Sequence, residues 1–180
     1  MEIINAQEQY VPQIGHLFKE SFGSNYMSQE QIRDHIRSGV PFKLAVEGPK
    51  LVGAILFIPS EEKNISDHVK MDGESIRHIC GGKKSLICKC ACVYDQYRGQ
   101  GVAEKILKEC MTDIEEQGYG AIFTTLWKYN GTVPARKIFA DSQFHKGKEL
   151  KMPWYHDTKY VCNICKGRCR CDGIVYYKAI

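Results

Sequence analysis

Apolar residues recur along the chain with two different periods, which predict an alternation of helices and strands. Helical spacing from Val11 to Phe22 predicts a helix that ends at Gly23, and a weaker repeat predicts a second helix over 29–37. Short apolar runs rich in β-branched residues predict strands. The predicted strands are 3–4, 42–46, 51–58, 86–93, 121–127, 144–150 and 174–180, and two further helices cover 103–114 and 134–141. This order predicts a mixed α/β sheet.

Two segments break the pattern. The segment 59–84 has no clear period, and the segment 151–173 is polar and rich in cysteine. We interpret 59–84 as a solvated loop with some helix, in the position of a substrate flap. A length of 180 residues predicts one domain, 1–180, that carries both segments as insertions.

The composition, with 43% hydrophobic and 26% charged residues, is ordinary for a globular protein. No apolar run approaches the roughly 20 residues of a membrane span, and the N-terminus has no signal-peptide pattern. We therefore expect a cytoplasmic protein without a membrane partner. In that compartment the nine cysteines are expected to be thiols or metal ligands rather than disulfides.

The stretch from Gln96 to Ala103 joins a predicted strand to a predicted helix through a glycine turn. Such an arrangement presents backbone N–H groups at a helix N-terminus, where the helix dipole favours a phosphate. Gly99 and Gly101 have no Cβ, so the backbone can approach phosphate oxygens closely. The P-loop and dinucleotide-binding patterns are both absent. A tight turn without a ligand is the structural alternative.

The turn resembles the acyl-CoA signature of the GNAT superfamily of N-acyltransferases, Gln/Arg-x-x-Gly-x-Gly/Ala. Gln96, Gly99 and Gly101 stand at its three defining positions. The order of predicted elements is similar to the GNAT fold over nearly the whole chain. The resemblance implies a central mixed sheet of six to seven strands flanked by about four helices, with 59–84 and 151–173 outside the common pattern.

The resemblance implies acetyl-CoA as the acyl donor and a primary amine as the acceptor. In the family the strand before the turn pairs its backbone with the pantetheine arm, which maps the arm onto Ala91, Cys92 and Val93. A family asparagine near this arm maps onto Asn130. The pyrophosphate maps onto the main-chain N–H groups of the turn and helix start, Arg98, Gly99, Gln100, Gly101, Val102 and Ala103.

The expected acid and base depart from the family's pattern. The family's tyrosine, four residues after Ala135, is replaced by Phe139, which has no proton to donate. The strand 86–93 carries no Asp or Glu where many relatives place one. The sequence leaves Tyr129, a bound water and a group from an insertion open as catalysts.

Three cysteines alternate in the strand before the turn. Cys88, Cys90 and Cys92 share one strand face, and we interpret them as small buried hydrophobes. The alternative is a covalent acyl-cysteine intermediate on Cys92, beside the expected thioester.

The second strong motif is a group of four cysteines, Cys162, Cys165, Cys169 and Cys171, around Gly167. Four thiolates in a tight loop suit one tetrahedral Zn²⁺ with a structural role. Iron–sulfur is the next choice, although the spacing matches neither common ferredoxin run. Unliganded thiols are the remaining alternative.

The leading hypothesis is an acetyl-CoA-dependent N-acetyltransferase that acts on a small-molecule or peptide amine. The rival is a CoA-binding sensor or adaptor that has lost catalysis, which the missing acid and base favour. A third hypothesis gives the cysteine loop a docking role for a nucleic acid or protein. The net charge of +4 makes a nucleic acid unlikely. The sequence leaves a homodimer open.

Overall fold

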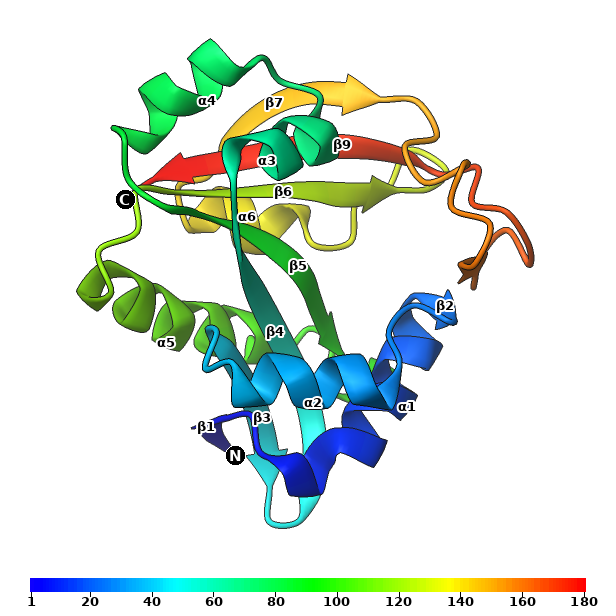
Figure 1. Ribbon diagram of the computed structural model, residues 1–180. Coiled ribbons are helices and arrows are strands. Elements are labelled where there is room, and N and C mark those ends of the chain that lie inside the picture. Colours follow the sequence, from blue (N-terminus) through cyan, green and yellow to red (C-terminus); the bar gives the residue numbers. More distant parts are fainter. The chain divides into compact units, whose positions relative to one another are not determined.

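The computed structural model describes all residues, 1–180, and has a mixed α/β fold (Figure 1). Its strands are β1 (Glu2–Asn5), β2 (Gly23–Ser24), β3 (Phe42–Glu47), β4 (Lys50–Ser60), β5 (Ser85–Val93), β6 (Ala121–Lys128), β7 (His145–Leu150), β8 (Val161–Cys162) and β9 (Asp172–Ala179). Its α-helices are α1 (Val11–Ser21), α2 (Gln29–Arg37), α3 (Glu62–Val69), α4 (Gly73–Cys80), α5 (Val102–Glu116) and α6 (Arg136–Asp141), with short 3₁₀ helices η1 (Glu8–Tyr10) and η2 (Asp95–Tyr97).

Seven strands form one mixed sheet in the order β1-β3-β4-β5-β6-β9-β7, and β2 and β8 form a separate two-stranded sheet. The chain divides into two compact units, and both β4 and β5 run through the two. The first unit comprises 1–56, 90–112 and 154–170, and the second comprises 57–89, 113–153 and 171–180. That the whole chain folds as one domain stays a prediction.

In the first unit, antiparallel β1, β3 and β4 pack against the amphipathic helix α1 (Figure 1). The buried face of α1 carries Val11, Ile14, Leu17 and Phe18. The Phe18 ring stacks on Phe42 of β3 with their centroids 6.4 Å apart. The helix α2 begins with a capping box, because Ser28 Oγ accepts from Gln31 N at 3.1 Å and Ser28 N donates to Gln31 Oε1 at 2.9 Å.

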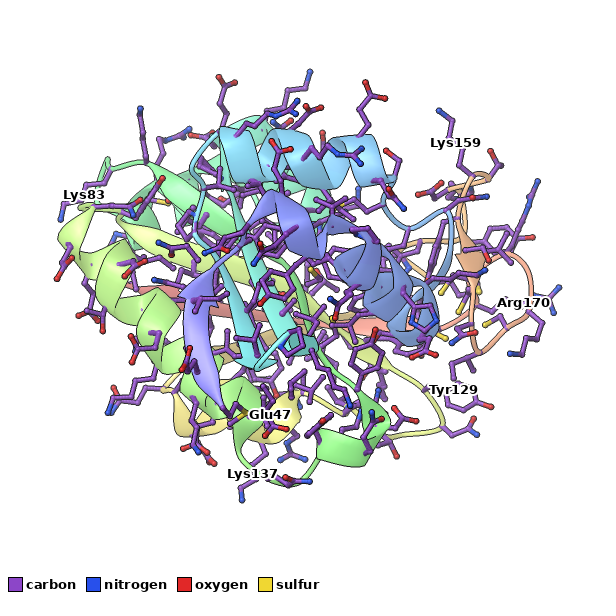
Figure 2. The ribbon with its side chains drawn as sticks, turned by 90° about the horizontal axis from the view of Figure 1, so that it is seen from below. Glu47, Lys83, Tyr129, Lys137, Lys159 and Arg170 are labelled. Carbon is purple, nitrogen blue, oxygen red and sulfur yellow. The ribbon has the colours of Figure 1, made fainter.

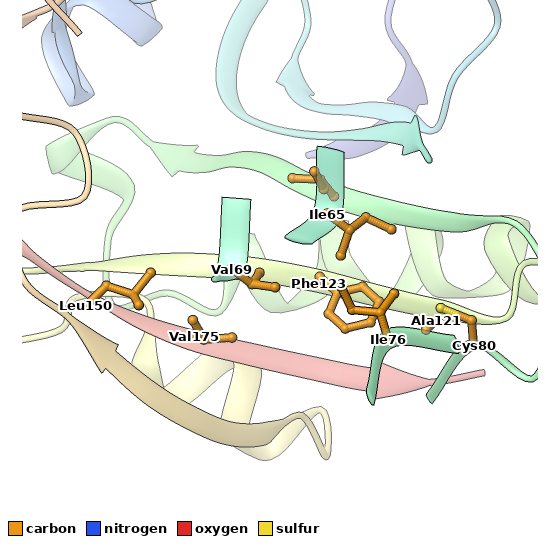
Figure 3. Close-up of a cluster of buried hydrophobic side chains, with 9 residues drawn as sticks. Ile65, Val69, Ile76, Cys80, Ala121, Phe123, Leu150 and Val175 are labelled. Carbon is orange, nitrogen blue, oxygen red and sulfur yellow. The ribbon is translucent and has the colours of Figure 1, made fainter. Parts of the chain in front are cut away.

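In the second unit, β6 pairs antiparallel with β9, and β9 with β7. The helices α3 and α4 pack on one face of these strands (Figure 1). Figure 3 shows the apolar cluster between them. The cluster is built from Ile65, Val69, Ile76, Cys80, Ile87, Ala121, Phe123, Leu150 and Val175.

The segment 59–84 is therefore mostly helical, and our interpretation of it as a solvated loop is wrong. Asp72 caps α4 through its bond from Ser75 N at 2.8 Å, and Gly81 ends the helix in the left-handed conformation. Ile65 and Ile76 are each only 1% exposed, which is the reason the two helices stay on the sheet. These helices raise the total from the expected four or so to the six observed. That the segment moves as a flap stays a prediction.

Candidate functional site

The glycine turn lies where the sequence predicts it, between the end of β5 and the start of α5. Gly99 and Gly101 have φ angles of +74° and +73°, in the region that only glycine adopts without strain. The bond from Lys105 N to Gly101 O is 3.1 Å and belongs to the first helical turn. The N–H groups at the start of α5, from Val102 to Glu104, consequently have no acceptor within the helix. They form the electropositive end expected of a phosphate-binding turn.

Tight packing fixes this turn against the first unit's sheet. A Cβ on Gly53 of β4 would lie 2.9 Å from Val93 Cγ2 and 3.2 Å from Ile106 Cδ1. No side chain fits there, so β4, the end of β5 and α5 lie in close contact. Tyr94 N donates to Val52 O at 3.0 Å and continues this contact beyond the strand.

The Arg98 side chain is held back on its own loop. Its Nε donates to Val93 O at 3.1 Å, and its Nη2 lies 2.8 Å from Asp95 Oδ1. The pyrophosphate contacts that the sequence assigns to this loop are main-chain contacts, and among these donors the N–H of Arg98 already donates to Asp95 O at 3.2 Å.

The residues expected to meet the pantetheine arm, Ala91, Cys92 and Val93, form the last three positions of β5. The parallel pairing of β5 with β6 covers only Ser85 to Ile87, opposite Ala121 to Phe123. One residue further on, Thr124 Oγ1 donates to Cys88 O at 3.0 Å in place of a backbone N–H. The backbone pairing of β5 with β6 therefore ends at Ile87, while β5 itself continues to Val93.

Cys92 is buried, as are Cys88 and Cys90. Burial raises the pKa of the Cys92 thiol to about 12, so the thiolate that a nucleophile requires is scarce at neutral pH. Its Sγ lies 3.8 Å from Ala54 O. These observations favour the packing interpretation of the strand cysteines, and we do not propose an acyl-cysteine intermediate.

After β6, in the second unit, Tyr129 pairs with Thr132 across a two-residue turn made of Asn130 and Gly131. Tyr129 N and O bond to Thr132 O and N at 2.9 and 2.8 Å, and Asn130 and Gly131 have φ angles of +46° and +77°. This is the geometry that Asn-Gly favours in a tight hairpin. The Tyr129 ring projects outward and is 43% exposed (Figure 2). Asn130 thus supplies the positive φ angle that the turn requires. The contact with the CoA arm is a separate role, which the resemblance implies.

Phe139 of α6 is completely buried. Its ring meets Phe144 edge-on at 4.9 Å, and the Tyr176 ring lies 6.5 Å away. The position that holds tyrosine in the family thus lies within a small aromatic core of the second unit.

The four cysteines of the loop after β7 converge on one point. Their sulfurs all lie within 4.8 Å of one another, whereas four sulfurs around one Zn²⁺ at about 2.3 Å lie roughly 3.8 Å apart. Cys162, Cys169 and Cys171 are buried, and Cys165 is half-buried. Burial alone raises the pKa of Cys162, but bonds from the N–H groups of Cys165 and Ile164 and from the neighbouring thiols outweigh it, so its pKa is lowered. The donor set fits a single thiophilic ion.

The loop is attached to the connection between α1 and α2, within the first unit. Gly23 of β2 pairs with Cys162 of β8, and Asn163 N donates to Phe22 O at 3.1 Å. Tyr160 Oη also donates to Phe22 O, at 2.7 Å. Lys159 and Arg170 project away from the loop (Figure 2). A metal ion bound here would therefore order the α1–α2 connection as well as the loop.

Sequence reasoning missed two buried polar groups in the second unit. His68 Nε2 on α3 and Trp127 Nε1 on β6 are buried without a hydrogen-bond partner. Burial first, and then the charges of Lys89 and Lys70, lower the pKa of His68 to about 4. The helical spacing of Ile65 and Val69 was the signal that would have placed His68 on a packed helix.

Comparison with known proteins supports the fold. No family model and no curated protein matches the sequence. Among solved structures, the chain is similar to a ribosomal-protein-alanine N-acetyltransferase from Brucella melitensis, with 16% identity, a TM-score of 0.68 and 100% of both chains covered. It is also similar to Arabidopsis thaliana Naa50 in complex with the bisubstrate analogue CoA-Ac-MVNAL, with 17% identity, a TM-score of 0.67 and 99% and 98% covered.

A third similar structure is an agmatine N-acetyltransferase, with 9% identity, a TM-score of 0.69 and 99% of both chains covered. At such low identities these similarities establish the fold and not the acceptor. The chain has the GNAT fold from end to end, so the resemblance drawn from the glycine turn is confirmed at the level of the fold. No helix of the structure has the length and apolar character needed to cross a membrane.

Proposed function

With the GNAT fold as the premise, we propose that this protein transfers an acetyl group from acetyl-CoA to a primary amine. The observation that carries the proposal is the glycine turn of Gly99 and Gly101, which lies at the end of β5 and the start of α5 in a chain of that fold. Structures of similar fold bear the names of N-acetyltransferases for a ribosomal protein and for agmatine. A peptide or small-molecule amine is therefore the acceptor class to test.

In this proposal, main-chain groups bind and orient the acetyl-CoA. The N–H groups at the start of α5 bind the pyrophosphate, and Ala91 to Val93 bind the pantetheine arm as a neighbouring strand would. The amine nitrogen attacks the thioester carbon, a C–N bond forms and the C–S bond breaks. The nitrogen gives up one proton and the CoA thiolate takes one. We assign no residue to the proton transfer at sulfur, because Phe139 has no proton to give and Tyr129 lies on an exposed turn.

A structural metal ion completes the proposal. Zn²⁺ held by Cys162, Cys165, Cys169 and Cys171 leaves no open position for water, so the ion orders the loop and takes no part in the reaction. A reducing compartment keeps thiols available as ligands, and a cytoplasmic location is part of the proposal.

A free-CoA release assay with acetyl-CoA tests the activity across small amines, amino acid amides, polyamines and peptides. Gly101→Val is the matched control, because a Cβ at this position would have no atom within 4 Å to clash with. We expect release with at least one amine and its loss in the variant. Release that is the same in both proteins would contradict the assignment of the turn.

One observation favours a second candidate function. Phe139 is enclosed, and β5 carries no carboxylate, so the residues that relatives use as acid and base are both missing. A CoA-binding adaptor needs neither. Calorimetric binding of acetyl-CoA without CoA release from any amine in the panel would support this alternative.

A further inference from the structure

The loop that carries the four cysteines also caps the C-terminal end of α1. The last carbonyl groups of a helix have no partner within the helix. Here Phe22 O accepts from Asn163 N at 3.1 Å and from Tyr160 Oη at 2.7 Å. Glu20 O accepts from the side-chain amide of Asn163. The end of α1 therefore takes its hydrogen bonds from the cysteine loop.

The same end of α1 contacts β5 within the first unit. Ser21, the last residue of α1, shares a side-chain hydrogen bond with the Cys92 thiol. Cys92 belongs to the part of β5 that we propose holds the pantetheine arm. The cysteine loop is thus connected to this part of β5 through the end of one helix.

The loop has little apolar packing of its own. In the range 151–170 only Cys162 and Cys169 are buried, while Val161 and Ile164 are 39% and 38% exposed. Two bonds of 2.9 Å, from Lys166 N to Cys162 O and from Cys162 N to Gly167 O, close a single turn. The order of the loop consequently depends on whatever links the four sulfurs to one another.

The four sulfurs differ in their access to solvent. Cys165 is half-buried, and the other three cysteines are buried. Cys165 follows Cys162 by three residues in the turn, and all four sulfurs lie within 4.8 Å of one another. A disulfide needs Cα atoms about 4.4–6.8 Å apart, a spacing that residues three apart in a tight turn satisfy. Cys162 is therefore the partner that Cys165 can bond with least movement of the chain.

We propose that Cys165 and Cys162 are a peroxide-sensitive oxidation site, and that their disulfide releases the end of α1. The Cys165 thiolate attacks one oxygen of hydrogen peroxide, so an S–O bond forms, the O–O bond breaks and hydroxide leaves. The Cys162 thiolate then attacks the Cys165 sulfur, the S–S bond forms and a second hydroxide leaves. The two thiolates have given two electrons to the peroxide, and each hydroxide takes a proton to become water.

The disulfide removes the links that order the loop. A metal ion would lose two of its four thiolate ligands and leave. The turn that carries Asn163 is then no longer joined through sulfur to Cys169 and Cys171, so the bonds to Phe22 O and Glu20 O weaken. Disulfides in a reducing compartment are typically transient, which suits a reversible switch. An effect on acetyl transfer rests on the proposed function, whereas the oxidation site does not.

The test treats the purified protein with hydrogen peroxide and maps disulfides by mass spectrometry after alkylation of the remaining thiols. The first disulfide should join Cys162 to Cys165, and any bound zinc should appear in solution in step with it. Amide hydrogen exchange should become at least roughly 10-fold faster in peptides covering 20–26 and 160–167, with α5 unchanged. Dithiothreitol with added zinc should restore the slow exchange.

Cys165→His is the matched variant, because histidine can supply the fourth zinc ligand but cannot form a disulfide. Its exchange at 20–26 should not respond to peroxide. A first disulfide between other cysteines, or oxidation of Cys165 to sulfinic acid alone, would overturn the site in the wild type, whether or not the variant binds zinc. A Cys162–Cys165 disulfide with unchanged exchange at 20–26 would overturn the release of α1. None of these measurements uses turnover, so a lack of CoA release from any amine would contradict only the proposed acetyl transfer.

Discussion

The buried imidazole of His68 should make the stability of the protein depend on pH in a way that one substitution removes. Burial first, and then Lys89 and Lys70, lower the pKa of His68 in the folded protein from 6.5 to about 4. In the unfolded chain the group titrates near its ordinary value. Between these two pKa values the unfolded state binds more protons, so the free energy of unfolding falls as the pH falls. Above pH 7 the ring is neutral in both states and contributes no pH dependence.

The size of this effect follows from the shift. One pKa unit corresponds to about 1.4 kcal/mol, so the full loss between neutral pH and pH 4 is about 3 kcal/mol. At pH 5 the loss is about 2 kcal/mol, because most but not all of the window has been crossed. A typical domain is stable by about 5–15 kcal/mol. The loss at pH 5 is therefore large enough to measure.

Urea unfolding of the wild type and His68→Gln at several pH values between 5 and 8 measures the effect. The variant cannot titrate at this position, so its stability relative to the wild type should improve by about 2 kcal/mol from pH 8 to pH 5. The cysteine site is common to both proteins and cancels in the difference. His78→Gln controls for the loss of a histidine from an exposed position. A difference between wild type and His68→Gln that stays constant over this range would show that the ring is not held neutral in the folded protein.

Four further outcomes are expected. Gly101→Val should weaken acetyl-CoA binding at least 10-fold in calorimetry, because valine disfavours a φ of +73°; unchanged affinity in a folded variant would refute the turn's role. Protein purified without added metal should contain one zinc ion, lost in Cys165→Ser; freely titrating thiols with neither zinc nor iron would exclude the metal. Gly23→Ala should detach the cysteine loop and increase its proteolysis, because the new Cβ would lie 1.9 Å from Val161 O; an equal rate of cleavage would contradict this. Phe139→Tyr should lower the unfolding free energy by about 1–3 kcal/mol without raising turnover; a stable, faster variant would show that the hydroxyl reaches the substrate.

Local patterns predicted the elements best where the period was strong and the ends were marked. The helix from Val11 and the strand before the glycine turn lie within a residue or two of the predicted bounds. The segment 59–84 was misinterpreted because its helices are only eight residues each. In helices so short, a few apolar positions carry the whole signal. Asp72 and Gly81 cap the two ends of α4, so the capping residues were a better signal for this helix than its period, and our interpretation of the sequence did not use them.

The cysteine site shows how far spacing in the sequence could reveal a site. Four cysteines within one loop are close in sequence, so their spacing alone predicts that the sulfurs can meet. Nothing in that spacing shows that Gly23 would approach Cys162, because that contact depends on the path of the chain between them. The Gly23 φ of +126° is a consequence of the contact and becomes visible only in the structure.

His68 and Trp127 show the same limit more sharply. Each is unremarkable alone, since a histidine near a helix end and a tryptophan in a strand usually find partners. The structure shows what neither residue reveals in the sequence, which is that each has a buried nitrogen without a hydrogen-bond partner. A buried N–H without a partner costs about 1–3 kcal/mol, and only the folded structure shows that the indole of Trp127 carries this cost.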